Sequence, residues 1–539
     1  ALRGRLDAVR ANPASLAEKE RSALLLALAP TLESFVGELF GISGEIKSLA
    51  ARHTELLPLF EAKRNFVQRK AINKIKAEEA AGFDIAAIQA ALEVALGGPL
   101  SEMLFATKVE AWLKEEAAHA EQLGLAAKYA AWAYHTPAGK ARHKSGVVFK
   151  APHKLDPEHL VHIETVDHSG APAYRMPTHE WRHREGFALT DHGMDLEKAA
   201  DQAFYCIKCH NQGKDSCSTG LREKTGEFKK SVFGVTLNGC PLSERISEMN
   251  VLKEEGVPLG ALAIVTVDNP MAAGTGHRIC NDCMKSCVFQ KQEPVDIPQI
   301  ETRTLKDVLE LPWGFEIYSL LTRWNPLNFE RPLPKASTGY KVLVVGLGPA
   351  GFTLAHHLMN DGHTVVGVDG LKIEPLDPSL SGIDALGNRV AFRPVRDVNE
   401  LYESLDNRVL AGFGGVAEYG ITVRWNKNYL KLLRLLIERR SEFSMFGGVR
   451  FGGGITIDSA FDLGFDHVAL CMGAGRPTGP LLATGVGATL AVGVVTFLAS
   501  LVLSGPAITI TFGQAYASGS TLIPPFIAAT TLLGMLLIL

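Results

Sequence analysis

Hydrophobic residues recur at helical spacing through the first quarter of the chain. Apolar positions three and four residues apart run through Ile85–Leu96 and Leu100–Tyr134, and no strand-like alternation interrupts them. The Gly-Gly-Pro sequence at 97–99 predicts a break between these two helices, and Pro30 predicts an end or a kink in an earlier one. The pattern predicts a helical domain over residues 1–135, used for packing and dimerisation or for docking a partner.

The segment 136–199 follows no regular period and is rich in histidine. An irregular linker is expected here. Because the histidine spacings repeat no ligand pattern, solvated loop histidines are expected rather than a metal site. The histidines are His143, His153, His159, His162, His168, His179, His183 and His192.

A strand–turn–helix–strand pattern begins near residue 340. Tyr340–Val345 is a Val-rich apolar run, a helical pattern continues to Asn360, and Thr364–Val368 reads as a second strand. This order predicts an α/β domain with a parallel sheet over residues 336–476.

The last 63 residues, Pro477 to Leu539, contain no Asp, Glu, Lys or Arg. Two apolar runs, Leu481–Ser504 and Leu522–Leu539, are separated by a turn that Gly505 and Pro506 are expected to begin. The first run is long enough to span the roughly 30 Å hydrocarbon core of a bilayer as a helix. A transmembrane hairpin over 477–539 is therefore expected, with a buried core helix as the alternative for the first run.

Composition narrows the class of protein. The 539 residues include 55 basic and 58 acidic side chains, a net charge of −3, which is not typical of a nucleic-acid-binding protein. Seven of the eight cysteines lie between Cys206 and Cys287. A disulfide-rich protein would be small, with cysteines cross-linked along its whole length. The clustering of cysteines in one part of this large chain instead indicates metal binding in a reducing compartment.

The cysteine spacing leaves three kinds of metal site open. Cys206-x-x-Cys209-His210 alone matches a c-type haem attachment motif, but it leaves the other clustered cysteines unexplained. Seven cysteines plus His210 would also satisfy two structural zinc sites. Two iron–sulfur clusters need eight ligands as well, and a proline after a cluster cysteine, as in Cys240-Pro241, is typical of ferredoxin-type runs.

The stretch from Gly239-Cys240-Pro241 to Glu293-Pro294-Val295-Asp296 resembles the iron–sulfur domain shared by the glutamate synthase small subunit and dihydropyrimidine dehydrogenase. The resemblance covers about residues 200–476, and its loop from Ser218 to Asn238 is longer here than in that family. It implies two [4Fe–4S] clusters with interleaved ligands in a helical domain over 200–335. The first would be held by Cys206, Cys209, Cys217 and Cys287, and the second by Cys240, Cys280, Cys283 and Glu301.

The turn after the first strand reads Gly346-Leu347-Gly348-Pro349-Ala350-Gly351 and carries the dinucleotide fingerprint in its proper context. Gly346 allows the tight turn, and Gly348 allows a pyrophosphate to approach the backbone. Gly351 allows the helix to pack closely on the strand. Asp369, which ends the second strand, would accept hydrogen bonds from ribose hydroxyls. The fingerprint alone does not distinguish FAD from NAD. The family resemblance implies FAD, and it extends to Gly415 and Glu418 near the flavin.

The resemblance ends near residue 476. No second glycine fingerprint for NADPH and no closing flavin segment follows. Either the hydrophobic hairpin replaces a pyridine-nucleotide domain, or the chain continues in a longer protein. Oxidation of NAD(P)H would then depend on a further domain or on a partner.

The sequence therefore predicts an oxidoreductase: a multi-domain iron–sulfur flavoprotein subunit that passes electrons between FAD and two clusters. No general acid or base and no substrate pocket is identifiable. A redox partner protein and attachment to the cytoplasmic side of a bacterial inner membrane through 481–539 are expected. The alternatives are a glutamate-synthase-like subunit that oxidises NAD(P)H and a zinc- and nucleotide-binding scaffold without turnover.

Overall fold

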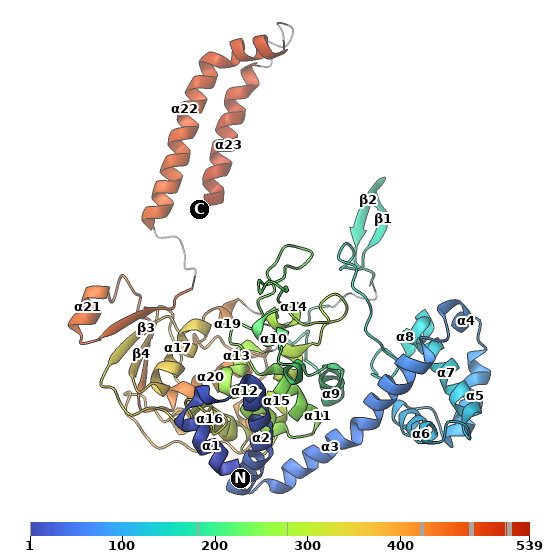
Figure 1. The fold of residues 1–539 in the computed structure, drawn as a ribbon. Helices are drawn as coiled ribbons and strands as arrows, with labels where there is room; N and C mark the ends of the chain where they lie inside the picture. The colour runs from blue at the N-terminus through green and yellow to red at the C-terminus, as the bar shows by residue number, and fades with distance from the viewer. Residues whose placement is uncertain are drawn as a thin grey trace. The chain divides into compact units, whose positions relative to one another are not determined.

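The computed structural model describes residues 2–178, 181, 183–276, 279–420, 425–473, 479–512, 514 and 520–538. The chain forms two compact units, Ala1–Cys471 and Met472–Leu539. The first unit contains most of the helices and a parallel sheet in its C-terminal part, and the second is helical (Figure 1). A multi-domain chain with many helices and a parallel sheet was expected from the sequence.

Helices fill the N-terminal third of the first unit. They are α1 (Leu2–Ala11), α2 (Glu18–Phe40), α3 (Ser43–Ala62), the π-helix η2 (Lys63–Ala71), α4 (Ala77–Ala81), α5 (Ile85–Leu96), α6 (Glu102–Lys114), α7 (Ala120–His135) and α8 (Pro137–Arg142). Helix α5 ends as predicted, with Gly97 in the left-handed region at φ 77°. The predicted run Leu100–Tyr134 is two helices rather than one, because residues 115–119 form a turn between α6 and α7.

The prediction that Pro30 ends or bends a helix is not confirmed, because α2 continues from Glu18 through Pro30 to Phe40. Leu28 and Leu32 on either side of the proline are both buried in the core. Burying each of these side chains contributes about 1.5–3 kcal/mol, which offsets the roughly 3 kcal/mol that an interior proline costs. Tertiary packing therefore outweighs the local signal.

The His-rich segment contains a two-stranded antiparallel hairpin, β1 (Glu164–His168) paired with β2 (Ala171–Arg175). His143 is not a solvated loop residue, since its Nε2 lies 3.0 Å from Tyr129 Oη and its Nδ1 lies 3.4 Å from Glu102 Oε1. It fastens the end of this segment to the bundle of α5–α8. His179 lies outside the described residues.

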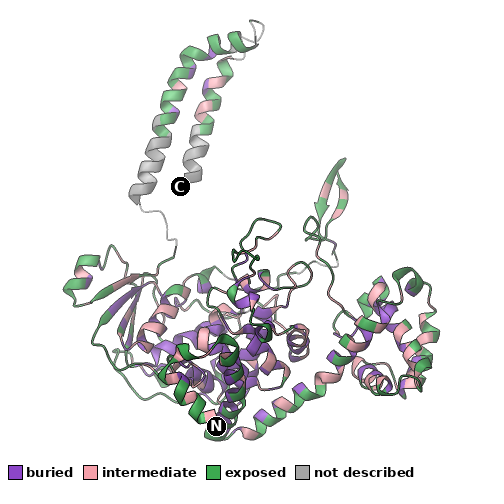
Figure 2. Ribbon diagram, viewed as in Figure 1, coloured by how far each residue is buried: buried purple, intermediate pink, exposed green. Residues whose placement is uncertain are grey.

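Short helices follow around the cysteines and pack on a buried central helix. They are α9 (Leu196–Tyr205), the 3₁₀ turn η4 (Cys209–Gln212), α10 (Ser216–Thr219), α11 (Ile246–Glu254), α12 (Pro258–Asp268), α13 (Ala272–Thr275), α14 (Asp282–Lys285), α15 (Ile297–Leu309) and α16 (Gly314–Arg323). Nearly every residue of α12 is buried, and α2, α11, α15 and α16 contact it. Figure 2 shows this concentration of buried residues at the centre of the unit.

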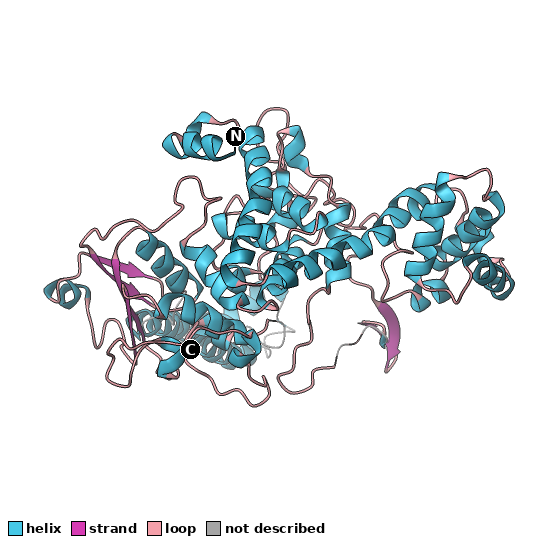
Figure 3. Cartoon of the chain, turned by 90° about the horizontal axis from the view of Figure 1, so that it is seen from below, coloured by secondary structure: helices cyan, strands magenta, loops and turns pink. Residues whose placement is uncertain are grey.

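The sheet has four parallel strands in the order β5-β4-β3-β6. Its elements are β3 (Lys341–Val345), α17 (Pro349–Asn360), β4 (Thr364–Asp369), α18 (Pro378–Ser381), η5 (Val398–Leu401), α19 (Val416–Tyr419), α20 (Asn428–Glu438), β5 (Phe443–Gly447), α21 (Ile457–Asp462) and β6 (His467–Leu470). The strands lie together at one end of the unit, with helices packed beside them (Figure 3). The predicted strands at 340–345 and 364–368 and the helix between them are confirmed.

The second unit consists of α22 (Gly479–Phe512) and α23 (Ile523–Ile538), which contact each other. The predicted break at Gly505 and Pro506 is wrong, since α22 continues through Pro506 to Phe512. A proline removes one backbone donor, and the hydrogen bonds of the turns on both sides can carry the helix past it. Among the residues described together with their side chains, α2 has the length and hydropathy to cross a membrane, and 44% of that window is buried in the protein. The apolar stretches of the second unit that are described in this way, Val492–Ser504 and Ser520–Thr530, are shorter.

One buried carboxyl predicts a pH-dependent stability. Glu33 in α2 accepts hydrogen bonds from the backbone N–H groups of Leu259 (2.8 Å) and Gly260 (3.2 Å) at the start of α12. Burial nonetheless raises the pKa of Glu33 to about 7. The folded chain therefore binds a proton on Glu33 more tightly than the unfolded chain does. The resulting stabilisation of the fold is present at low pH and is lost as the pH rises through about 7.

Glu33→Gln should remove this pH dependence while keeping an acceptor for α12. We expect the wild type to lose roughly 2–3 kcal/mol of stability between about pH 5 and about pH 8 that the variant does not lose. Calorimetric unfolding at the two pH values measures it. Equal slopes for the two proteins would show that Glu33 stays ionised in the folded chain.

Candidate functional site

Four cysteines from separate elements line one small cavity. Cys206 follows α9, Cys209 opens η4, Cys217 lies in α10 and Cys287 follows α14. All four are buried, and Ile207 and Phe289 complete part of the wall. We call these four residues the first cysteine group.

The sulfur atoms of this group influence one another's protonation. The Cys217 thiol donates a hydrogen bond to Cys287, which lowers the pKa of Cys287 and raises that of Cys217. Burial raises the pKa of Cys206 and raises that of Cys209 to about 12. The Lys208 N–H donates to Cys206 Sγ at 3.4 Å. Buried thiols that lie close together are suited to bind a soft metal. Water cannot solvate thiolates in such a site, whereas a coordinated metal displaces the thiol protons and stabilises the thiolates.

A second group forms around Glu301 in α15. Cys283 is buried, and Glu301, Cys240 and Cys280 all lie near enough to raise its pKa further after burial. The Asn269 amide donates to Glu301 Oε1 at 2.8 Å, and burial holds the pKa of Glu301 well above its usual range. We call Cys240, Cys280, Cys283 and Glu301 the second group. Cys283 is therefore within electrostatic reach of the other three residues that the family resemblance assigns to the second cluster, and of Glu244 as well.

The two groups adjoin each other through their backbone. The Cys240 N–H donates a hydrogen bond to the Cys217 C=O at 2.8 Å. A candidate ligand of the second group is therefore hydrogen-bonded to a candidate ligand of the first group. Gly239 N–H donates to Ser286 Oγ at 2.9 Å, next to Cys287. Gly239 has φ 83°, and a Cβ there would lie 2.6 Å from Ser218 O, so glycine is required for this approach.

Among the described residues, no three His, Cys, Asp or Glu side chains are arranged to hold a single metal ion. A zinc ion requires its ligands to converge on one point at 2.0–2.3 Å. A [4Fe–4S] cluster instead takes one thiolate at each of four irons, so its ligands surround a volume. The four cysteines that line the cavity supply the number and kind of ligands that either site requires.

The glycine-rich turn lies at the carboxyl end of β3. Gly346 has φ 93°, and Gly348 is the N-cap of α17, whose first turn contains Pro349 and the exposed Ala350. A Cβ on Gly351 would lie 1.8 Å from Gly346 O, which explains the glycine by packing. The strand order reverses between β3 and β6, and parallel sheets bind ligands at such a crevice.

Asp369 is already engaged with the loops around it. Its carboxylate accepts from the Leu347 N–H (2.9 Å) and the Leu371 N–H (3.0 Å). These bonds hold the glycine-rich turn against the end of β4, and they leave lone pairs on both oxygens for ribose hydroxyls. The sequence did not indicate this positioning role.

Gly415 and Glu418 belong to a second loop that lies against the glycine-rich turn. A Cβ on Gly415 would lie 2.9 Å from Gly348 Cα, and Gly414 N–H donates to Leu347 C=O. Glu418 is buried, and its carboxylate pairs with both terminal nitrogens of Arg408 at 2.9 Å. Glu418 therefore braces this loop, and Arg408 is a residue that the sequence analysis missed.

Helix α13 connects the second group with the nucleotide domain. Asn269, which holds Glu301, also donates to Thr275 Oγ1 at 2.6 Å. On the other side, Trp425 Nε1 donates to Ala273 C=O at 3.2 Å, and Gly274 packs against Phe352 of α17. The short helix therefore contacts α15, which carries Glu301, and α17, the helix that begins at the glycine-rich turn.

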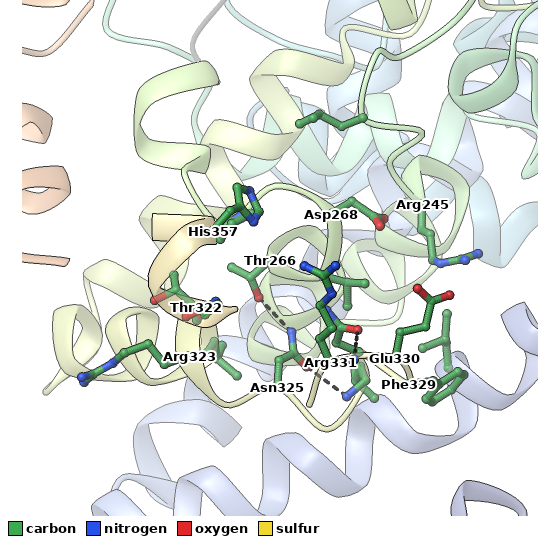
Figure 4. Close-up of a pocket in the computed structure, with 18 of the residues that line it drawn as sticks. Arg245, Thr266, Asp268, Thr322, Arg323, Asn325, Phe329, Glu330, Arg331 and His357 are labelled. Atoms are coloured by element: carbon green, nitrogen blue, oxygen red, sulfur yellow. Dashed lines mark hydrogen bonds between the residues drawn. The ribbon is translucent and has the colours of Figure 1, made fainter. Parts of the chain in front are cut away.

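A separate pocket lies among α2, α16 and α17 (Figure 4). Two of its arginines are engaged with neighbouring carboxylates: Arg245 pairs with Glu18 at 3.2 Å and Arg331 with Asp361 at 3.2 Å. Asn325 donates to Ala263 C=O and to Thr266 Oγ1. These contacts fix the junction of the helices, and none of the sequence-predicted site residues lies here.

Comparison with known proteins gives relatives for parts of the chain. Residues 1–41 match the family model of the RP005 N-terminal alpha-helical domain. The uncharacterized protein RP006 of Rickettsia prowazekii is 54% identical over 207 residues, and RP005 of the same organism is 28% identical over 261 residues. The glutamate synthase [NADPH] small chain of Mycobacterium tuberculosis is 30% identical over 207 residues.

These matches are partial. The RP006 match covers 38% of this chain and 28% of that protein, and the RP005 match covers 46% of this chain and 85% of that protein. The glutamate synthase match covers 35% of this chain and 38% of its relative. The chain is thus distantly related to the glutamate synthase small chain over about a third of its length, in agreement with the resemblance noted in the sequence.

Proposed function

We propose that this chain is an iron–sulfur flavoprotein that transfers electrons between FAD at the glycine-rich turn and two [4Fe–4S] clusters at the two cysteine groups. The observation that carries the proposal is the cavity lined by Cys206, Cys209, Cys217 and Cys287. Three neighbouring cysteines and Cys287, which is far from them in the sequence, all line this cavity, and this grouping of buried thiols supports a metal group that joins them.

The order of the sites supports a chain of electron transfer. Helix α13 contacts α17 and also Asn269, which donates to Glu301, and these contacts support a short path between the second group and the glycine-rich turn. The Cys240–Cys217 backbone bond then brings the first group next to the second. A flavin, when bound, exchanges hydride for single electrons, and clusters accept electrons singly.

The protein side chains would position the cofactors and set their potentials. Gly346 and Gly348 keep the turn clear for phosphates, and the free N–H groups at the start of α17 favour the negative charge. Burial of the first group excludes water from the sulfurs, and the Lys208 N–H bond to Cys206 stabilises negative charge there.

A reductive titration under anaerobic conditions tests the function. The purified chain should take up about four electrons, two in the flavin and one in each cluster. The visible absorption should bleach in at least two phases. A colourless protein that contains zinc and takes up no electrons would support the scaffold alternative and overturn this proposal.

We also propose that residues 481–539 attach the chain to a membrane. The segment from Pro477 to Leu539 has no charged side chain, and one Lys or Asp at the centre of a bilayer would cost about 3 kcal/mol. Helix α22 has 34 residues, more than the roughly 20 needed to cross. Lys and Arg occur up to Arg476, which favours a cytoplasmic location for the first unit.

Fractionation with and without residues 481–539 tests this attachment. The full chain should remain in carbonate-washed membranes and require detergent, and the truncated chain should be released into the soluble fraction with its iron content unchanged. A full chain that stays in solution without detergent would contradict the attachment, and so would a truncated chain that stays in the membranes.

A further inference from the structure

An aromatic groove lies on the outer side of the first cysteine group. It runs between η2 and α9 and is lined by Phe60, Lys63, Arg64, Gln68, Asp201, Phe204, Tyr205, Ile207 and Phe289. Ile207 and Phe289 also line the cavity of the four cysteines. One layer of side chains therefore separates the groove from the first group.

The aromatic rings of the groove are held in fixed positions. Tyr205 and Phe289 stack with centroids 4.7 Å apart and planes 15° apart. Gln292 Nε2 donates to Tyr205 Oη at 2.8 Å, and Tyr205 Oη donates to Glu293 C=O at 3.0 Å. Tyr205 directly precedes Cys206, so this stack ends at a residue bonded to the first group.

The opposite wall comes from a π-helix, a rare conformation that is found frequently at functional sites. Ile72 N–H bonds to Val67 C=O, five residues earlier, at the end of η2. Lys63 and Arg64 at the start of η2 and Gln68 one turn later line the groove. Lys63 Nζ is fixed by both oxygens of Asp201 (2.8 and 2.7 Å), and the Arg64 guanidinium lies 5.6 Å from the ring of Phe204.

Size and chemistry limit the ligand. The cavity is about 180 Å³. A cavity of roughly 150 Å³ accepts benzene, so this one has room for a single ring or a small fused ring. Aromatic walls favour a flat ring. Lys63 is engaged with Asp201, whereas the exposed Arg64 guanidinium can donate hydrogen bonds but cannot accept them, and the Gln68 amide can also donate. These donors favour a ring that carries acceptors such as carbonyl oxygens.

We propose that this groove binds the head group of a quinone, which exchanges electrons with the first cysteine group. The proposal rests on the proposed function for the source of the electrons. Reduction would take two electrons, delivered singly from the reduced cluster, and two protons from solvent to form the hydroquinone. The reverse reaction returns both.

Calorimetric titration of the whole chain with duroquinone tests binding without relying on turnover. Duroquinone has a methyl group at every open ring position, so thiols have no free ring carbon for addition. Gln68→Trp should fill the groove and weaken binding at least about tenfold, while Arg69→Trp, an exposed neighbour in the same π-helix, should leave it within about twofold. Arg64→Ala should also weaken binding, by about tenfold, through loss of a charged donor.

Durene, the same ring without carbonyl oxygens, is the ligand control. Equal affinity for durene and duroquinone, or equal affinity of wild type and Gln68→Trp for duroquinone, would overturn the proposal. Absence of duroquinone binding would overturn it as well and would favour a protein partner at this face. Iron content is measured on the same samples. Duroquinone binding to a chain without iron would refute the proposed function but not the quinone site in the groove. Iron in a chain that does not bind duroquinone would refute the quinone site but not the proposed function.

Discussion

Replacing Cys206 with serine should remove one cluster, about half of the iron, and Cys287→Ser should remove the same half. The two residues are far apart in the chain but line one cavity. Cys283→Ser should remove the other half, because Cys283 lies with Cys240, Cys280 and Glu301. Iron analysis and low-temperature EPR of each reduced variant measure the loss and show which signal disappears.

Cys471→Ser is the matched control. This cysteine lies after β6, half-buried, and its Cβ is 3.5 Å from the position of a Cβ on Gly351, away from both groups. Its replacement should leave the iron content at the wild-type value. If Cys206→Ser and Cys287→Ser abolish different signals, the interleaved assignment of ligands is wrong.

Gly348→Ala should lose flavin while the chain stays folded. A Cβ at Gly348 would meet only Gly415 Cα at 3.6 Å and Gly414 O at 3.8 Å, which are ordinary contacts. The methyl group would instead occupy the space through which backbone approaches a pyrophosphate. We expect at least about a tenfold weaker affinity for FAD, with a change in melting temperature of only a few degrees.

Gly351→Ala separates packing from ligand binding. A Cβ there would lie 1.8 Å from Gly346 O, so the start of α17 must move away from β3. This variant should lower the melting temperature as well as the flavin content. Flavin fluorescence after heat release, together with thermal unfolding, distinguishes the two variants. Full flavin retention in Gly348→Ala would place the cofactor elsewhere.

The nucleotide turn was predictable because its signals are local. A Val-rich strand, glycines at fixed offsets and a following helix all lie within one stretch of sequence, and the structure contains them as β3, Gly346–Gly351 and α17. The bonds that fasten the turn are not local. Asp369 binds Leu347, and Arg408 binds Glu418 in a separate loop, and neither pairing follows from spacing.

The grouping of the cysteines could not be derived from spacing alone. Cys217 and Cys287 meet because the intervening helices α11 and α12 fold into the core, and only the family resemblance anticipated their pairing. The break predicted at Gly505 and Pro506 failed for a related reason, since Pro506 lies inside a helix that continues past it, and α2 likewise does not end at Pro30. The buried Lys253–Asp307 pair and the π-helix at 63–71 had no recognisable sequence signal.

Anaerobic purification followed by iron, acid-labile sulfide and flavin analysis tests the central claim most directly. The account predicts about eight iron and eight sulfide per chain with one FAD. Stoichiometric zinc with no iron, or NAD in place of flavin after gentle extraction, would contradict it.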